Sequence, residues 1–501
     1  MSMHFTKSLA VNRLWLLSFL VVLASGVSGR TNDEKVLDRI DRKAEKLKKE
    51  ILRSKSSVPS ARTIYYVSSS EGNDANDGLS PERPLQSLQK VNELPLEEGD
   101  AVLFRRGDLF RGCVRSHVGC TYSAYGKGPK PRLYGSPCNA AREGEWRETD
   151  QKNVWAYSLP LKQDVGTLVF DEGDKGCAMK VMKVRHEDGS TTHIETGEPF
   201  ADYHDLHRDL DFWHDYQETG TVYLCSEEGN PSERFEDIEL LVKTHIIYAK
   251  SGVTIDNLCL KYCGAHGIGA GTVTSLDVSN CEIGWIGGSI QAENLFGRSH
   301  PTRYGNAIEI YGGCGHFSVD HCFIYQVYDA GITHQFSSGG AESIRMEYVS
   351  YTNNLVEDCV YAIEYFLGKA SDDNASRLMS NVRIEDNILL RAGEGWGRQR
   401  PDKDTPALLK SWGHHNPAID FIVKDNIFAM STHNLLNVAA GSSEWLPILE
   451  GNTYVQTLGG KGGQLGMGNK SYIYDKTFPD VMKELFREEQ GSYVMLPETQ
   501  R

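Results

Sequence analysis

The chain has 501 residues, of which 40% are hydrophobic and 49 are glycine, a composition typical of a folded and turn-rich protein. Its formal net charge of −15 argues against nucleic acid as a partner, because phosphate binding needs concentrated Lys and Arg. The 11 cysteines are an odd number, so at least one thiol stays free or pairs outside the chain.

The first 29 residues show the three parts of an export signal. Lys7 and Arg13 give a positive start, residues 14–23 are apolar apart from Ser18, and small residues follow between positions 24 and 29. The apolar run is about half of the roughly 20 residues needed to span a bilayer. We therefore expect a signal peptide over residues 1–29, a secreted or otherwise extracytoplasmic protein, and no stable membrane span after cleavage. An uncleaved anchor is the alternative.

Residues 30–60 are rich in charge and are predicted to form a helical spacer. Apolar residues recur there at steps of three and four, which marks one face of a helix: Val36, Ile40, Ala44, Leu47 and Ile51. Such a helix could be a stalk, a small coiled coil or a lid on the body of the protein. A solvated spacer is the simplest of these interpretations.

A change of pattern begins at residue 61. A strand at 64–67, a short helical pattern at 85–94 and a second strand at 101–104 follow one another. Because the terminal repeats of a solenoid need caps, we interpret residues 61–140 as an N-terminal cap with the first coils. Residues 141–244 suggest paired strands with Gly and Asp turns, so we expect an inserted, antiparallel β-rich subdomain there.

The insertion contains His204, His207 and His214 among many carboxylates. Their spacing lacks the i, i+4 arrangement of the common helical zinc motif, which favours a polar surface loop over a metal site. No Gly-rich nucleotide loop precedes a helix anywhere in the chain, and we predict no organic cofactor.

A strand-like motif recurs over residues 245–460. In each copy, alternating apolar residues and a polar pair lead to a small thiol or amide residue, and these equivalent residues are Cys281, Cys322, Asn354, Asn387, Asn426 and Asn452. A column of asparagines fits parallel stacking, where side-chain amides can hydrogen-bond along the axis. An amphipathic pattern around Phe478–Phe486 then predicts a C-terminal helical cap within residues 461–501.

These repeats resemble the right-handed parallel β-helix, or pectin-lyase-like, superfamily of secreted carbohydrate-active proteins. The resemblance covers roughly residues 63–460 without the insertion. It implies an all-β fold: a right-handed parallel β-helix with an inserted antiparallel β-rich subdomain and short helical caps. The superfamily holds lyases, hydrolases, epimerases and phage tailspikes, so the fold alone does not decide the activity.

A second set of strands predicts an outward-facing surface stripe. If Ile308, Ile332, Ile363 and Leu409 point inward, the residues that follow them point outward: Glu309, Thr333, Glu364 and Lys410. A parallel stripe lies two residues further along each strand: Tyr311, Gln335, Phe366 and Trp412. Aromatic faces beside carboxylates and a lysine suit a sugar polymer, because rings pack on the apolar faces of pyranoses.

The leading hypothesis is a polysaccharide hydrolase that uses Glu309 and Glu364 as its acid and base. Their backbones would lie two coils apart, about 10 Å, and side chains could bring the carboxyls into the roughly 6.5–9.5 Å window of an inverting enzyme. Asp329 is a third candidate carboxylate, although Asp-Ala-Gly could simply form a turn. Trp396 and Arg398, in an insert that we expect to wall the groove, are predicted to bind substrate.

Two other functions stay open. A polysaccharide lyase needs a base at C5 of a uronic acid and a group that neutralises its carboxylate; Lys410, His334 or the arginines Arg398 and Arg400 could serve, and a calcium ion is another candidate. The polygalacturonase set of Asn-Thr-Asp, Asp-Asp, Gly-His-Gly and Arg-Ile-Lys motifs is not present as a set, and the pectate lyase calcium pattern does not match. A non-catalytic glycan-binding surface protein is the third hypothesis, which the charged helix and the odd cysteine fit slightly better.

Overall fold

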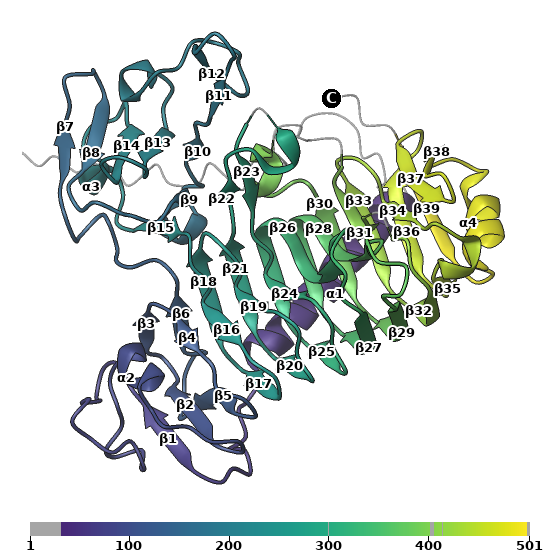
Figure 1. Ribbon diagram of the computed structural model, residues 1–501, viewed down its shortest axis with the longest axis horizontal. Helices are drawn as coiled ribbons and strands as arrows, with labels where there is room; N and C mark the ends of the chain where they lie inside the picture. Colours follow the sequence, from purple (N-terminus) through teal and green to yellow (C-terminus); the bar gives the residue numbers. More distant parts are fainter. Residues whose placement is uncertain (1–31, 299, 401–404, 413, 498–501) are drawn as a thin grey trace, which may run out of the picture.

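The computed structural model describes residues 32–298, 300–400, 405–412 and 414–497 (Figure 1). The predicted signal peptide lies outside these ranges. None of the described helices is long and apolar enough to cross a membrane.

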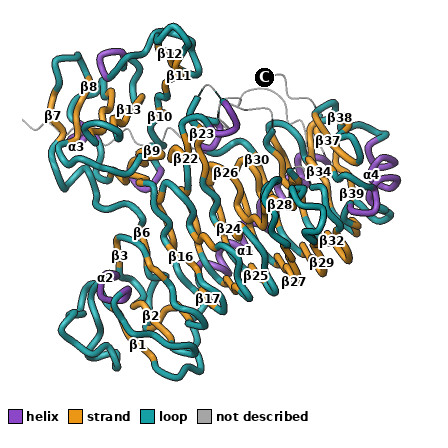
Figure 2. The backbone as a smooth tube through the Cα atoms, viewed as in Figure 1, coloured by secondary structure: helices purple, strands orange, loops and turns teal. Residues whose placement is uncertain are grey.

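Three stacks of parallel strands wind around one apolar core, as the coils in Figure 2 show. The first stack is a ten-stranded sheet made of β1 (Ile64–Val67), β2 (Ala101–Arg105), β5 (Thr121–Tyr125), β17 (Val253–Asp256), β20 (Leu276–Ser279), β25 (Phe317–Asp320), β27 (Ile344–Thr352), β29 (Arg377–Glu385), β32 (Ala418–Lys424) and β35 (Ile448–Glu450). All neighbouring pairs in it are parallel.

The other two stacks share the long strands β26 (Phe323–Phe336) and β28 (Leu355–Leu367), each of which contributes to both. The second stack continues through β3 (Leu109–Arg111), β6 (Arg132–Tyr134), β18 (Cys259–Cys263), β21 (Glu282–Ile286), β30 (Ile388–Ala392), β33 (Ile427–Ser431), β36 (Thr453–Thr457) and β39 (Ser492–Leu496). The third contains β4 (Val114–Arg115), β16 (Ile247–Ala249), β19 (Ile268–Ala270), β24 (Ile308–Tyr311), β31 (Ala407–Ser411), β34 (Leu436–Ala439) and β37 (Lys461–Gly466), with β38 (Lys470–Ile473) antiparallel at its end.

This arrangement confirms the predicted right-handed parallel β-helix with helical caps. The short helix α2 (Leu88–Asn92) packs Leu88 and Val91 into the first coils, and α4 (Phe478–Phe486) packs Phe478, Met482 and Phe486 onto the last ones. Both cap helices therefore cover apolar residues that would otherwise face water.

The predicted amide column is present and hydrogen-bonded along the axis. Each side-chain Nδ2 of Asn354, Asn387 and Asn426 donates to the next Oδ1 in the column at 2.9–3.0 Å, and Asn452 ends the series by donating to Glu488. Cys281 and Cys322 are buried in the same column. The 11 cysteines all lie within the described ranges and are free thiols.

Helix α1 (Asn32–Leu52) lies along the second stack (Figure 1) instead of standing free in solvent. Its apolar face packs on residues from six successive strands: Phe323, Leu355, Ile388, Ile427, Val455 and Leu496. The 21 residues of α1 span about 31 Å at 1.5 Å per residue, which matches the height of roughly six coil steps. The predicted helix face is therefore a lateral cover of the β-helix.

The insertion forms a separate sheet with its own core beside the β-helix. Its strand order is β10 (Met179–Lys180), β13 (Asp211–Asp215), β14 (Thr221–Cys225), β8 (Val154–Tyr157) and β7 (Trp146–Glu148), antiparallel except for the pair β10–β13. Two smaller antiparallel pairs accompany it, β11 (Lys183–Arg185) with β12 (Thr191–His193) and β9 (Val165–Phe170) with β15 (Ile238–Val242); helix α3 (Pro231–Arg234) precedes β15.

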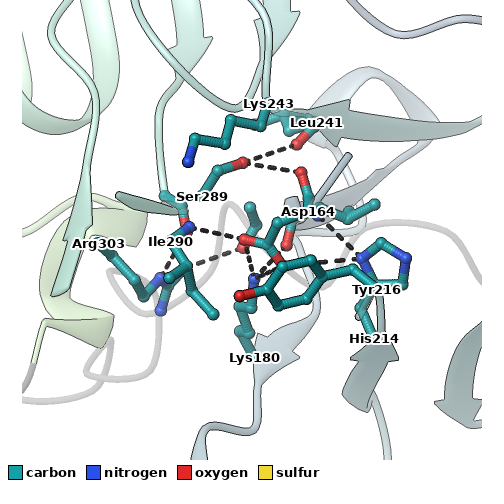
Figure 3. A network of polar contacts seen from close by, with 12 residues as sticks. Asp164, Lys180, His214, Tyr216, Leu241, Lys243, Ser289, Ile290 and Arg303 are labelled. Atoms are coloured by element: carbon teal, nitrogen blue, oxygen red, sulfur yellow. Dashed lines mark hydrogen bonds and ion pairs between the residues drawn. The ribbon is translucent and has the colours of Figure 1, made fainter. Parts of the chain in front are cut away.

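A buried polar joint connects the insertion to the β-helix (Figure 3). Both carboxylate oxygens of Asp164 accept hydrogen bonds of 2.6 Å from Lys180 Nζ, and one also accepts from the backbone N–H of Ile290. Ser289 Oγ donates to the carbonyl of Asp164 at 3.0 Å. Ser289 and Ile290 begin the hairpin of β22 (Ser289–Ala292) and β23 (Thr302–Tyr304), which leads directly into β24. The joint therefore fixes the segment that precedes Glu309.

Candidate active site

The hydrogen-bond register aligns the predicted stripe residues on the outer surface of the third stack. Glu309 pairs with Thr333, Thr333 with Glu364, and Glu364 with Lys410. The stripe continues to Asn437, which pairs with Lys410. The two glutamates therefore lie on strands two steps apart, with Thr333 between them.

Glu309 is held by amides. Its Oε2 accepts hydrogen bonds from Asn306 Nδ2 and from Gln335 Nε2, the latter at 3.0 Å. His266 Nδ1 lies 3.4 Å from the same oxygen. Burial raises the pKa of Glu309 to about 7, against the lowering effect of the two amide hydrogen bonds. This carboxyl is therefore set up to hold a proton near neutral pH.

Glu364 has a cationic neighbour instead. Its Oε1 lies 3.5 Å from Lys410 Nζ, and Lys410 also sits 3.4 Å from the ring centroid of Tyr361 and 4.5 Å from that of Trp412. Burial raises the pKa of Glu364 to about 7 as well, although the charge of Lys410 opposes that rise. The two carboxyls therefore share a raised pKa and differ in their neighbours: a lysine beside Glu364, and amides beside Glu309.

Asp329 is a third carboxylate of the same cluster. Arg400 Nη1 donates to Asp329 Oδ1 at 2.6 Å, and its guanidinium lies over the rings of Tyr328 and Tyr361. The negative charge of Asp329 contributes to raising the pKa of both Glu309 and Glu364. Asp329 lies within the long strand β26, at the register shift between Val327 and Ala330 where that strand passes from the second stack to the third.

Aromatic side chains flank the carboxyl cluster. Tyr311 is 41% exposed and Trp412 is 49% exposed, although each lies beside buried neighbours of the stripe. Between them, Gln335 and Phe366 are half-buried. Tyr311 ends β24 and Trp412 directly follows β31, and these two strands are three steps apart, about 14 Å, so the exposed rings lie on either side of the carboxyls.

Two predicted binding residues do not reach this surface. His334 points into the β-helix, where its Nδ1 contacts the Tyr351 hydroxyl at 2.7 Å, because strand alternation places it opposite Thr333. Trp396 is 4% exposed; its Nε1 donates to the carbonyl of Gln326, and its ring packs on Tyr328. Arg398 is exposed and, with Arg400, lines a pocket of about 420 Å³.

The structure also brings in residues that strand periodicity did not identify. Asn306 binds Glu309 and accepts the backbone N–H of Ala330 at 2.8 Å, so it connects two coils of the site. His266 is buried, and burial lowers its pKa to about 4. Asn306 lies two residues before β24 begins at Ile308, and strand alternation gave no sign of its contact with Glu309.

Within the ranges that the structure covers, no group of three or more His, Cys, Asp or Glu side chains could hold a metal ion. The insertion's His204 contacts Asp202 and Asp150, and His214 is buried beside Asp164.

Comparisons with known proteins find only distant similarities. No family model matches the chain. A lacto-N-biosidase of Bifidobacterium longum subsp. longum is 35% identical over 108 residues, which is 19% of this chain and only 6% of that relative. A solved structure described as a glycoside hydrolase matches with a TM-score of 0.47 at 10% identity, covering 85% of this chain and 98% of the other. The complex of XylC with xylose matches with a TM-score of 0.41 at 14% identity, covering 81% and 70%.

Proposed function

We propose that this protein is a glycoside hydrolase that cleaves a glycan chain lying across the third stack of its β-helix. The observation that carries the proposal is the pair of buried carboxyls, Glu309 and Glu364, on either side of Thr333 and flanked by exposed rings. Enzymes that cut glycosidic bonds use two carboxyl groups, one protonated and one ionised. Burial and unequal neighbours provide that difference here.

The neighbours assign the roles. Glu309 contacts neutral amides and a neutral histidine, so we assign it as the general acid that protonates the leaving oxygen. Glu364 has Lys410 beside it to stabilise a carboxylate, so we assign it as the base that removes a proton from the attacking water. Tyr311 and Trp412 would stack on the sugars, and Gln335 and Phe366 would line the floor between them.

The spacing supports an inverting mechanism. Two strand steps separate the backbones of Glu309 and Glu364 by about 10 Å, and side chains that lean towards each other would bring the carboxyls into the roughly 6.5–9.5 Å window of inverting hydrolases. Asp329, fixed by Arg400, is the second candidate for the group opposite the acid. If Asp329 were a nucleophile, the reaction would retain the anomeric configuration of the sugar.

The lyase hypothesis receives less support from these contacts. Lys410 is 2% exposed, pairs with Glu364 and lies against two rings, so its amine is already engaged. Arg400 is likewise bound to Asp329, which leaves less cationic surface for a uronate. The 108-residue similarity to a lacto-N-biosidase also favours a glycosidase. With the export signal expected at residues 1–29, we propose that the enzyme acts outside the cytoplasm.

Replacement of each glutamate separates an enzyme from a glycan-binding protein. Glu309→Gln and Glu364→Gln should each lower kcat at least about 100-fold while glycan binding persists, because each removes one acid–base function. Glu444→Gln, at an exposed glutamate outside the site, should retain full activity. Unchanged turnover in both site variants would contradict the assignment.

A further inference from the structure

Thr333 occupies an unusual position between the two glutamates. Its side chain is outward in the stripe yet has no exposed surface. Its hydroxyl oxygen is buried and has no hydrogen-bond partner among the residues that the structure describes. Buried hydroxyls are nearly always paired, because an unpaired one loses its hydrogen bonds to water without replacement.

Packing alone does not explain a threonine here. Valine has almost the same shape, is also favoured in strands, and would leave no unpaired donor at a fully buried position. The hydroxyl is therefore the feature of Thr333 that needs an explanation, and its two neighbours on the stripe are both carboxyls.

The strand spacing places both carboxyls within side-chain reach of this hydroxyl. Neighbouring strands lie about 4.8 Å apart, and Thr333 is one step from Glu309 and one from Glu364. The hydrogen bonds of Glu309 to described residues use Oε2, and the ion pair of Glu364 uses Oε1. Thr333 Oγ1 is hydrogen-bonded to neither carboxyl in this structure, so a bridge between them requires the other oxygen of each glutamate to turn towards the hydroxyl. A hydroxyl in that position can donate one hydrogen bond and accept another.

We propose that Thr333 is a positioning residue that relays a proton from Glu364 back to Glu309 after each turnover. This inference rests on the proposed hydrolase function. Hydrolysis moves the Glu309 proton to the leaving oxygen and a water proton to Glu364, so the enzyme ends with its proton on the wrong carboxyl. In the relay, Glu364 gives its proton to Thr333 Oγ1 while Thr333 Oγ1–H gives its proton to the Glu309 carboxylate. Threonine is unchanged and one proton has crossed.

The charged and titratable groups around the pair come from every neighbouring element. His266 and Tyr304 face Glu309 from the preceding coil and hairpin, Asp329 lies on β26 itself, and Lys410 and Arg400 face Glu364. The positive charges of Lys410 and Arg400 favour the ionised form of Glu364, so they favour transfer of its proton back to Glu309. That transfer needs a group between the two carboxyls that can both accept and donate a proton. Thr333 is the hydroxyl in that position.

Kinetics of Thr333→Val and Thr333→Ser test the relay. In Thr333→Val, kcat should fall about tenfold or more while kcat/KM stays within about twofold, because the reset follows product release. The solvent isotope effect on kcat that the relay produces in the wild type should be lost in this variant. The melting temperature of the variant should be no lower than that of the wild type. Thr333→Ser restores the hydroxyl and should recover kcat. Equal losses in kcat and kcat/KM, or no loss, would overturn the proposal.

A titration without substrate separates this inference from the proposed function. In protein carrying isotope-labelled glutamate, a bridging hydroxyl stabilises the singly ionised pair and so spreads its two apparent pKa values. Thr333→Val should narrow that spread by about one unit, and Thr333→Ser should keep it. An unchanged spread in the valine variant refutes the bridge. If the wild type cleaved no glycan but the two pKa values still moved closer together in Thr333→Val, the bridge would stand. The hydrolase function, and with it the direction of the relay, would then be refuted.

Discussion

Glu309 illustrates how burial prepares one residue for acid chemistry. The carboxyl is 7% exposed, and its closest partners are two side-chain amides and a histidine whose own pKa is lowered to about 4. No cation among the described residues contacts it directly, so protonation is the most favourable way to avoid a buried, unpaired negative charge. The free-energy cost of ionising Glu309 arises only in the folded state, so it can be measured from protein stability without any substrate.

Replacing Glu309 by Gln should therefore stabilise the protein at alkaline pH. The folded pKa of about 7 lies above the ordinary 4.5, so the folded state binds more protons between these values and loses stability as pH rises through them. The variant should gain up to roughly 3 kcal/mol at about pH 8 and nothing below about pH 4. Thermal melts across pH measure the difference; a constant offset would contradict the raised pKa.

Trp412 should contribute to substrate affinity without taking part in the chemistry. Its ring is half exposed at the edge of the stripe, beyond the strand that carries Lys410. Trp412→Ala should raise KM about tenfold, or ~1.4 kcal/mol, with kcat within about threefold. Trp412→Phe keeps an aromatic face and should retain most of the affinity. A loss confined to kcat in the alanine variant would place this residue in the acid–base machinery instead.

At the scale of elements, the joint between the insertion and the β-helix contains one buried ion pair. Asp164 and Lys180 are both nearly fully buried, and the charge of Lys180 helps hold the pKa of Asp164 at about 2 despite burial. A folded pKa below 3.8 means that this stability is present above about pH 4 and is lost as pH falls towards 2.

Asp164→Asn should destabilise the insertion by about 3–5 kcal/mol, because it leaves Lys180 as an unpaired buried charge. The double variant Asp164→Asn, Lys180→Met removes that charge and should recover most of the loss. Limited proteolysis and thermal melting would measure the stability of the insertion in each variant. If the single and double variants behaved alike, the ion pair would not be what secures the joint.

The sequence allowed us to predict which strand residues lie together in the site, but not which side chains contact one another there. Strand alternation and repeat spacing were enough to place Glu309, Thr333, Glu364 and Lys410 in one stripe, because a parallel stack fixes neighbours by register. The same alternation, applied strictly, puts His334 inside with Ile310 and Tyr365. Arg400 could not be paired with Asp329 in advance, since 71 residues and the path of an irregular insert separate them.

At the scale of the whole molecule, α1 connects successive coils by packing against several of them. A stack of coils held only by contacts between neighbours can fray one coil at a time. The helix packs on six successive strands, and beyond its end Ser54 Oγ donates to Asn257 Oδ1 and accepts from Lys130 Nζ near the first coils. The amphipathic pattern predicted this helix but not its partner, because its apolar face could equally have met another helix.

Shortening a buried side chain of α1 should weaken the entire β-helix. Ile51→Ala, at a residue 1% exposed, should lower the free energy of unfolding by about 2–4 kcal/mol. Lys43→Ala, at an exposed position of the same helix, should cost less than about 0.5 kcal/mol. Denaturant unfolding compares them. An Ile51 variant as stable as the wild type would show that the helix adds little to the β-helix.

The central claim, hydrolysis by the Glu309–Glu364 pair, is tested most directly by product chemistry. The purified chain is incubated with neutral and uronic-acid polysaccharides while new reducing ends and the absorbance of unsaturated sugars are followed together. The account predicts reducing ends with no unsaturation on at least one glycan, and the initial product should have the anomeric configuration opposite to that of the substrate. Unsaturated products would contradict it and point to elimination; binding without any cleavage would contradict it and point to a glycan-binding protein.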